Sequence, residues 1–184
     1  MKFTEGQCLE VCKIIAPKYA LEPLVVLTFC RQEPKKDAKD PKLFLADVAA
    51  PEPGFYGWLQ KRVEFATTSE VLFSASYGVT QVMGEVLREQ GYFERDFQSQ
   101  NDAYKATYGV PTHPNHIRDA IDRYCENLPA QIDACCRKIV AAKKTAGEDL
   151  RKIALTYNGG GRPGYADEWM EKYNAIQKDY GGAS

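Results

Sequence analysis

The sequence predicts a mainly α-helical protein with a single domain, and three observations lead to this fold class. Apolar side chains recur at helical spacing in several segments, most clearly within 79–91, 129–144 and 165–176. Helix-bounding residues such as Pro23, Pro34 and Gly91 lie at the ends of periodic segments. No internal repeat or low-complexity linker divides the 184 residues, a length that suits one domain with a sizeable core. We therefore expect residues 1–184 to form one domain.

The first two helices are predicted from their ends. Thr4 and Gln7 form a capping-box pattern, so a first helix should begin there and run toward Pro17. A second helix should begin at Pro23, because proline is favoured in the first helical turn. We expect this helix to end at Glu33, since the following proline disfavours helical geometry in the residue before it.

The middle of the chain is less regular. We expect a charged loop over 35–42, short strands over 43–48 and 71–74, and a short helix over 55–65. A clearer helix should follow, with Val79, Val82, Met83, Val86 and Leu87 on one face and Gly91 as its C-cap.

The second half of the chain begins with a polar, turn-rich stretch over 94–116, which we interpret as an irregular insertion. Helices are then expected over 117–127, 129–144, 148–157 and from 165 onward. The glycine-rich turn 159–164 separates the last two.

Composition excludes several classes of protein. The net charge of −1 gives no basic field for binding nucleic acid. No stretch approaches the roughly 18 apolar residues of a membrane span. The first residues lack the apolar core of a secretory signal, so we expect a protein made in the cytoplasm without a signal peptide. Six cysteines are then expected as thiols, and the absence of a CxxC pair argues against a zinc site.

Glu33 is the residue that most strongly suggests chemistry. It follows the apolar run 24–30 at a helix C-terminus, whose partial negative charge disfavours a carboxylate. Phe29 and Cys30, one turn earlier, offer an apolar wall. Both effects raise the pKa of a carboxyl group. A glycosidase needs such an acid, protonated near neutral pH, to donate to the leaving oxygen of a sugar bond. The alternative is a solvated glutamate at a helix end.

Two other segments carry groups suited to sugar binding. In the segment 76–84, Gly78 permits close approach of the backbone, and the Gln81 amide can donate and accept hydrogen bonds. The alternative for Gln81 is a polar surface residue at an ordinary helix N-terminus. The segment 154–160 contains Tyr157 and Asn158 followed by glycines, which would equally suit a helix C-cap.

Taken in order, Glu33, the segment 76–84 and the segment 154–160 resemble the three short motifs of soluble lytic transglycosylases, and the segment 52–56 resembles phage-type members. The resemblance implies a lysozyme-like α+β fold with a small irregular or β region after the catalytic helix. It implies that Glu33 is the catalytic residue and that Tyr157 hydrogen-bonds Glu33 or the substrate's N-acetyl group. The implied substrate-binding residues are Ser76, Gly78, Gln81, Met83, Tyr157 and Asn158. Pro34 departs from the family, which usually has serine after the glutamate.

The implied activity is cleavage of the β-1,4 bond between N-acetylmuramic acid and N-acetylglucosamine in peptidoglycan, with 1,6-anhydromuramic products. Glu33 would act as both acid and base, without a metal or cofactor. The implied partner is the peptidoglycan glycan strand, with no nucleic acid and no membrane insertion. We expect a monomer that acts at the bacterial cell wall, in phage lysis or from a virion.

Two alternatives stay open at the sequence level. A lysozyme-like or chitinase-like hydrolase on the same fold would need a second carboxylate to activate water. Asp47 and Glu52 are the preferred candidates, and Asp37 and Asp40 are also placed near Glu33 in the chain. The second alternative is a non-catalytic glycan-binding structural protein of a phage particle.

Overall fold

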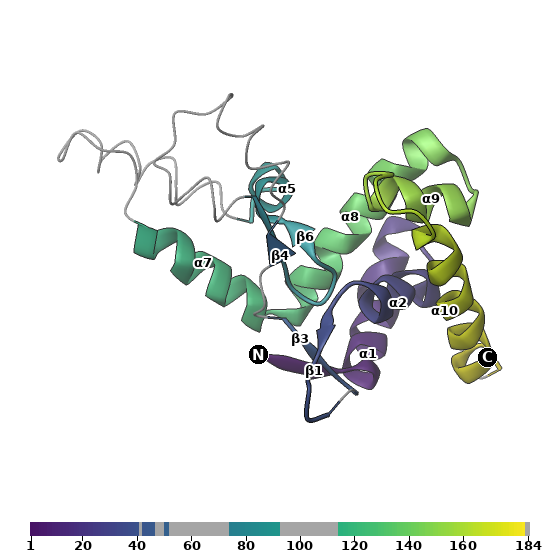
Figure 1. Ribbon diagram of the computed structural model, residues 1–184, viewed down its shortest axis with the longest axis horizontal. Helices are drawn as coiled ribbons and strands as arrows, with labels where there is room; N and C mark the ends of the chain where they lie inside the picture. The colour runs from purple at the N-terminus through teal and green to yellow at the C-terminus, as the bar shows by residue number, and fades with distance from the viewer. Residues whose placement is uncertain (41, 47–49, 52–73, 93–113, 183–184) are drawn as a thin grey trace.

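The computed structural model describes residues 1–40, 42–46, 50–51, 74–92 and 114–182 (Figure 1). Helices dominate this part of the chain, and two small three-stranded antiparallel sheets accompany them. The prediction of a mainly helical fold is therefore confirmed.

The N-terminal elements begin as predicted. The Thr4 hydroxyl accepts the Gln7 N–H at 3.2 Å, and Gln7 Oε1 accepts the Thr4 N–H at 2.8 Å, which completes the capping box. A single turn of 3₁₀ helix follows α1 and carries Pro17. The elements of this part are β1 (Lys2–Thr4), α1 (Glu5–Ile15), η1 (Ala16–Tyr19) and α2 (Pro23–Gln32).

The first sheet has the strand order β1-β3-β2, with β2 (Lys35–Lys36) and β3 (Leu43–Leu45). The predicted loop 35–42 thus contains a short strand, because its first residues pair with β3. The predicted strand 43–48 is found over its first three residues, and 47–48 lie outside the described residues. The predicted helix 55–65 also lies outside them.

The second sheet has the order β4-β5-β6, formed by β4 (Ala50–Pro51), β5 (Ala75–Tyr77) and β6 (Val82–Met83). The strand predicted at 71–74 lies mostly outside the described residues, and β5 begins just after it. The helix predicted from residue 79 is wrong in its first part, because Val82 and Met83 pair with β5. Only α5 (Gly84–Glu89) is helical, and Gly91 follows it with a φ of 84°.

The remaining helices agree closely with the prediction. The main difference lies in the predicted irregular insertion 94–116: residues 94–113 are outside the described part of the chain, and 114–116 are already helical. Asn127 and Asp149 cap α8 and α9 with their side chains. The helices are α7 (Pro114–Glu126), α8 (Leu128–Ala146), α9 (Leu150–Tyr157) and α10 (Tyr165–Tyr180).

Helix α2 lies at the centre of the helical body, where it contacts α1, α8 and α10 (Figure 1). Its residues from Val25 to Cys30 are all buried. The largest wholly buried side chains include Phe29 of α2 with Tyr165 and Trp169 of α10. The six cysteines are buried thiols, and none of them forms a disulfide. Among the described helices, none is both long enough and apolar enough to cross a membrane.

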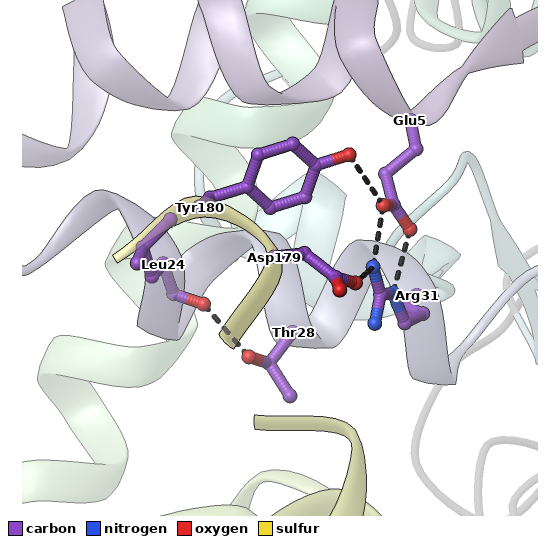
Figure 2. A network of polar contacts seen from close by, with 6 residues as sticks. All are labelled: Glu5, Leu24, Thr28, Arg31, Asp179 and Tyr180. Carbon is purple, nitrogen blue, oxygen red and sulfur yellow. Dashed lines mark hydrogen bonds and ion pairs between the residues drawn. The ribbon is translucent and has the colours of Figure 1, made fainter. Parts of the chain in front are cut away.

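An ion-pair network fastens the end of α10 to α1 and α2 (Figure 2). The Arg31 guanidinium donates to the two Glu5 carboxylate oxygens at 2.6 and 2.5 Å, and to Asp179 at 3.2 Å. The Tyr180 hydroxyl donates to Glu5 at 2.9 Å. Burial alone would raise the pKa of Glu5, but the hydrogen bonds from Arg31 and Tyr180 outweigh it and lower that pKa. The position of α2 is therefore fixed at the turn that precedes Glu33.

Candidate functional site

Glu33 is the C-cap of α2, and its backbone N–H donates to the Phe29 carbonyl at 2.9 Å. The prediction that the helix ends here is confirmed. The expectation that Glu33 itself leaves helical geometry is wrong, since its φ and ψ are −82° and −41°. The helix ends because Pro34 has no N–H to continue the hydrogen-bond ladder.

The Glu33 carboxyl is half-buried, and the Tyr165 hydroxyl at the start of α10 donates a hydrogen bond to its Oε1. Burial raises the pKa of Glu33, while the Tyr165 hydrogen bond and the charges of Lys138, Arg162 and Lys172 act against this rise. Burial dominates, so the pKa of Glu33 lies above its ordinary value. Glu33 consequently keeps its proton to higher pH than a solvated glutamate, as a general acid requires.

The segment 76–83 forms a tight turn between β5 and β6. Gly78 has a φ of 77°, and its carbonyl accepts both the backbone N–H and the side-chain amide of Gln81, at 3.2 and 2.9 Å. Gln81 has a φ of 46° and is only 8% exposed. It is therefore neither in a helix nor a polar surface residue, and its amide stabilises the turn.

Gln131 of α8 holds this turn, and no sequence motif had pointed to it. Its wholly buried side chain accepts the Val79 N–H at 2.8 Å and donates to the carbonyls of Tyr124 and Cys125 at 3.0 and 2.9 Å. A Cβ at Gly78 would lie 2.8 Å from Gln131 Oε1. The signal in the sequence was a glutamine one turn before Cys135, on the buried face of a strongly periodic helix.

Tyr157, at the end of α9, brings the three sequence segments together. Its hydroxyl donates to the Thr80 carbonyl at 2.9 Å, which links it to the turn between β5 and β6. Its ring packs on Phe29, with centroids 4.1 Å apart, one turn before Glu33. Segments that are distant in the chain therefore meet at the C-terminal end of α2.

The expected hydrogen bond from Tyr157 to Glu33 is absent, because the Tyr157 proton is donated to Thr80. Tyr165 makes that contact instead. The sequence analysis gave Tyr165 no role beyond the start of the last helix, in the periodic segment 165–176. Both tyrosines have a pKa raised above the ordinary value, with burial as the first cause and the charge of Glu33 as a further one.

The remaining predicted binding residues are Ser76, Met83 and Asn158. Ser76 and Met83 are opposite each other in the register of β5 and β6, with Ser76 buried and Met83 half-buried. Asn158 is the C-cap of α9 and its N–H donates to the Ala154 carbonyl at 3.1 Å. The helix C-cap was the alternative interpretation of this residue, and it is confirmed.

The predicted second carboxylates, Asp47 and Glu52, lie outside the described residues. Asp37 is described, and its carboxylate is engaged by Lys2 at 2.6 Å and by the backbone N–H groups of Lys39 and Asp40 at 2.7 and 3.0 Å. These bonds hold the pKa of Asp37 below its ordinary value. Asp37 therefore stabilises the loop that contains it.

Within the described part of the chain, no His, Cys, Asp and Glu side chains are grouped so as to hold a metal ion. A scan against models of protein families gives no match for this chain, and neither curated proteins nor solved structures match it. The site consists of a half-buried acid of raised pKa that accepts a hydrogen bond from the buried Tyr165. The buried Tyr157 links the helix that carries this acid to the glycine-containing turn.

Proposed function

We propose that this protein is a peptidoglycan-cleaving lytic transglycosylase with a lysozyme-like fold, and that Glu33 is its general acid and base. The observation that carries the proposal is the meeting of three segments at the end of α2. Phe29 of the helix that presents Glu33 packs on Tyr157, and Tyr157 donates to Thr80. These are the same segments that resemble the family's motifs, and such short motifs gain weight when the fold brings them together.

The chemistry follows from the state of Glu33. With its pKa raised, the protonated carboxyl donates to the glycosidic oxygen between N-acetylmuramic acid and N-acetylglucosamine. The resulting carboxylate then accepts the proton of the muramic acid 6-hydroxyl, whose oxygen bonds to C1 and closes the 1,6-anhydro ring. One carboxyl serves both steps, so water and a second carboxylate are not required.

Tyr165 supports this double role. Its hydroxyl donates to Glu33 Oε1, and so it stabilises the carboxylate formed after the first step. The cations Lys138, Arg162 and Lys172 act in the same direction. The free acid is favoured by burial and its conjugate base by these donors and charges, which keeps both forms accessible during one turnover.

The test is release of soluble glycan from purified peptidoglycan by the wild-type protein, Glu33→Gln and Glu171→Gln. Glu171 is an exposed residue of α10 and is the matched control for loss of a glutamate charge. We expect Glu33→Gln to abolish release and Glu171→Gln to retain it. Release by Glu33→Gln at the wild-type rate would exclude Glu33 as the acid. Binding of glycan without any release by the wild type would favour the non-catalytic glycan-binding alternative.

A further inference from the structure

The side chain of Gln32, the residue before Glu33, connects the end of α2 to α10. Its Oε1 accepts a hydrogen bond from the Lys172 ammonium, and its Nε2 donates to Glu168 Oε2 at 3.4 Å. Glu168 and Lys172 are one turn apart in α10, so they lie on the same face of that helix. The Gln32 amide is therefore used both as an acceptor and as a donor, which gives it one orientation.

Tyr165 lies on this same face of α10, one turn before Glu168. Its hydroxyl donates to Glu33 Oε1. Gln32 and Glu33, which are consecutive in the chain, thus bind side chains from the first two turns of α10. The contact that Gln32 makes and the contact that Glu33 makes belong to one junction between the two helices.

The carboxylate of Glu168 is itself oriented by the turn that precedes α10. Arg162 Nη2 donates to both Glu168 carboxylate oxygens, at 3.0 and 2.8 Å. The side chains of Arg162 and Glu168 are 57% and 44% exposed, so this ion pair adds little stability by itself. It holds the Glu168 carboxylate where the Gln32 amide reaches it.

The start of α10 depends on such contacts. Its N-cap is Gly164, with a φ of 76°, and no side chain caps the helix there. The first N–H groups of a helix lack partners within the helix, and an end without a capping side chain is held less firmly. Burial of Tyr165 and Trp169 keeps α10 in the core, but apolar packing is non-directional, whereas the bond from Tyr165 to Glu33 requires a defined direction.

We propose that Gln32 is a positioning residue for Glu33: by fastening the first two turns of α10 to the end of α2, its side chain keeps the Tyr165 hydroxyl on the Glu33 carboxyl. The importance of this contact for cleavage rests on the proposed function. Without the Gln32 amide, the Tyr165 hydroxyl is aimed less well at Glu33. The carboxylate form of Glu33 then loses part of the hydrogen bond that stabilises it, and the pKa of Glu33 rises further.

The experiment is an NMR titration of the side-chain carboxyl carbon of Glu33 in protein that contains isotope-labelled glutamate. The signal is assigned by its loss in Glu33→Gln. The proteins compared are the wild type, Gln32→Ala, Tyr165→Phe and the double variant of these two changes. Gln32 is neutral, so Gln32→Ala removes no charge from the surroundings of Glu33. If Gln32→Ala does not fold, Gln32→Met removes the same amide and keeps the length of the side chain.

Gln177→Ala is the matched control. The Gln177 side chain also donates to a side chain of α10, the Tyr173 hydroxyl, at 2.8 Å. Gln177 lies about 18 Å farther along the helix than Tyr165, so the loss of its amide should leave the pKa of Glu33 unchanged.

We expect Gln32→Ala to raise the pKa of Glu33 by at most the rise that Tyr165→Phe causes, and to add no rise in the Tyr165→Phe background. The smaller alanine side chain also admits water to Glu33, which lowers the pKa of a buried carboxyl, so greater exposure does not explain a rise. A pKa of Glu33 that stays constant or falls in Gln32→Ala would overturn the inference. An equal rise with and without the Tyr165 hydroxyl would overturn it too, because the effect would then not pass through Tyr165.

Release of glycan by the same variants separates this inference from the proposed function. In Gln32→Ala the basic limb of the kcat/KM profile should move to higher pH, as we expect for Tyr165→Phe. A wild-type protein that releases no glycan would overturn the proposed function, while the NMR titration, which needs no activity, still decides whether Gln32 positions Tyr165 on Glu33.

Discussion

The contact between Gly78 and Gln131 gives a prediction that is independent of catalysis. Gly78→Ala must place a Cβ in a backbone with a φ of 77°, which costs about 1–2 kcal/mol for a residue with a side chain. That Cβ would also lie 2.8 Å from Gln131 Oε1. The Gln131 side chain cannot easily move aside, because three hydrogen bonds to Val79, Tyr124 and Cys125 hold it. We therefore expect Gly78→Ala to lower the free energy of unfolding by about 3 kcal/mol.

Gln131→Ala removes the same three hydrogen bonds, including the one that the Val79 N–H donates, while the Tyr124 carbonyl keeps its bond from the Asn127 N–H at 3.0 Å; the change should cost about 2–4 kcal/mol. In a protein that already carries Gln131→Ala, the Cβ added by Gly78→Ala no longer meets the Gln131 side chain. The double variant should therefore be about 1–2 kcal/mol more stable than the sum of the two single changes predicts.

The assay is urea unfolding at neutral pH, followed by circular dichroism, for the single and double variants. Gly91→Ala is the matched control, since Gly91 has a φ of 84° but no atom of the described residues within 4 Å of the methyl group that the substitution would add. Gly91→Ala should cost only the strain of a side chain in a left-handed backbone, and its effect should be additive with that of Gln131→Ala. The reasoning is refuted if Gly78→Ala destabilises no more than Gly91→Ala, or if Gly78→Ala and Gln131→Ala are additive.

The remaining predictions concern ionisation. The raised pKa of Glu33 means that its contribution to stability is present at low pH and is lost as the pH rises through the folded-state value. Glu33→Gln should therefore melt at a higher temperature than the wild type at neutral pH and at the same temperature near pH 4. Equal melting temperatures of the two proteins at neutral pH would contradict this. Tyr165→Phe removes a donor to the carboxylate, so the pKa of Glu33 should rise and the basic limb of the kcat/KM profile should move to higher pH; a shift to lower pH would count against the contact. Arg31→Met leaves Glu5 half-buried and without its main partner, which should cost about 2–3 kcal/mol at neutral pH. Because the pKa of Glu5 is lowered, this loss of stability should shrink as the pH falls through the folded-state pKa of Glu5. Unfolding titrations of the wild type and the variant at pH 7 and pH 3 measure the loss, and an equal loss at both pH values would contradict the prediction.

Helices in this chain could be predicted because their signals are local. The Thr4–Gln7 capping box and the prolines at 23 and 129 each act within one or two turns, and the structure places helix ends beside them. The position of Glu33 at the end of an apolar helix, and hence the direction of its pKa shift, follows from the same local information.

The turn between β5 and β6 could not be predicted, because its pattern is ambiguous. The apolar residues from Val79 to Leu87 have helical spacing, yet the left-handed backbone of Gly78 and Gln81 and the pairing of β6 with β5 prevent a helix there. Long-range contacts decide the result, namely the hydrogen bonds from Gln131 and Tyr157.

The choice between Tyr157 and Tyr165 as the partner of Glu33 was likewise beyond the sequence. Both residues are tyrosines near the glycine-rich turn, and only the direction in which that turn sends α10 decides which hydroxyl reaches the carboxyl. The sequence analysis expected Tyr157 to contact Glu33, whereas in the structure Tyr157 donates to Thr80 of the neighbouring turn and Tyr165 donates to the acid.

The most direct test of the central claim is mass spectrometry of the fragments released from purified peptidoglycan by the wild-type protein and by Glu33→Gln. The proposed activity predicts 1,6-anhydromuramic ends from the wild type and none from the variant. Reducing ends would contradict the transglycosylase mechanism and indicate a hydrolase, with Asp47 and Glu52 as the carboxylates to replace next. Anhydro ends released equally by both proteins would contradict the role of Glu33.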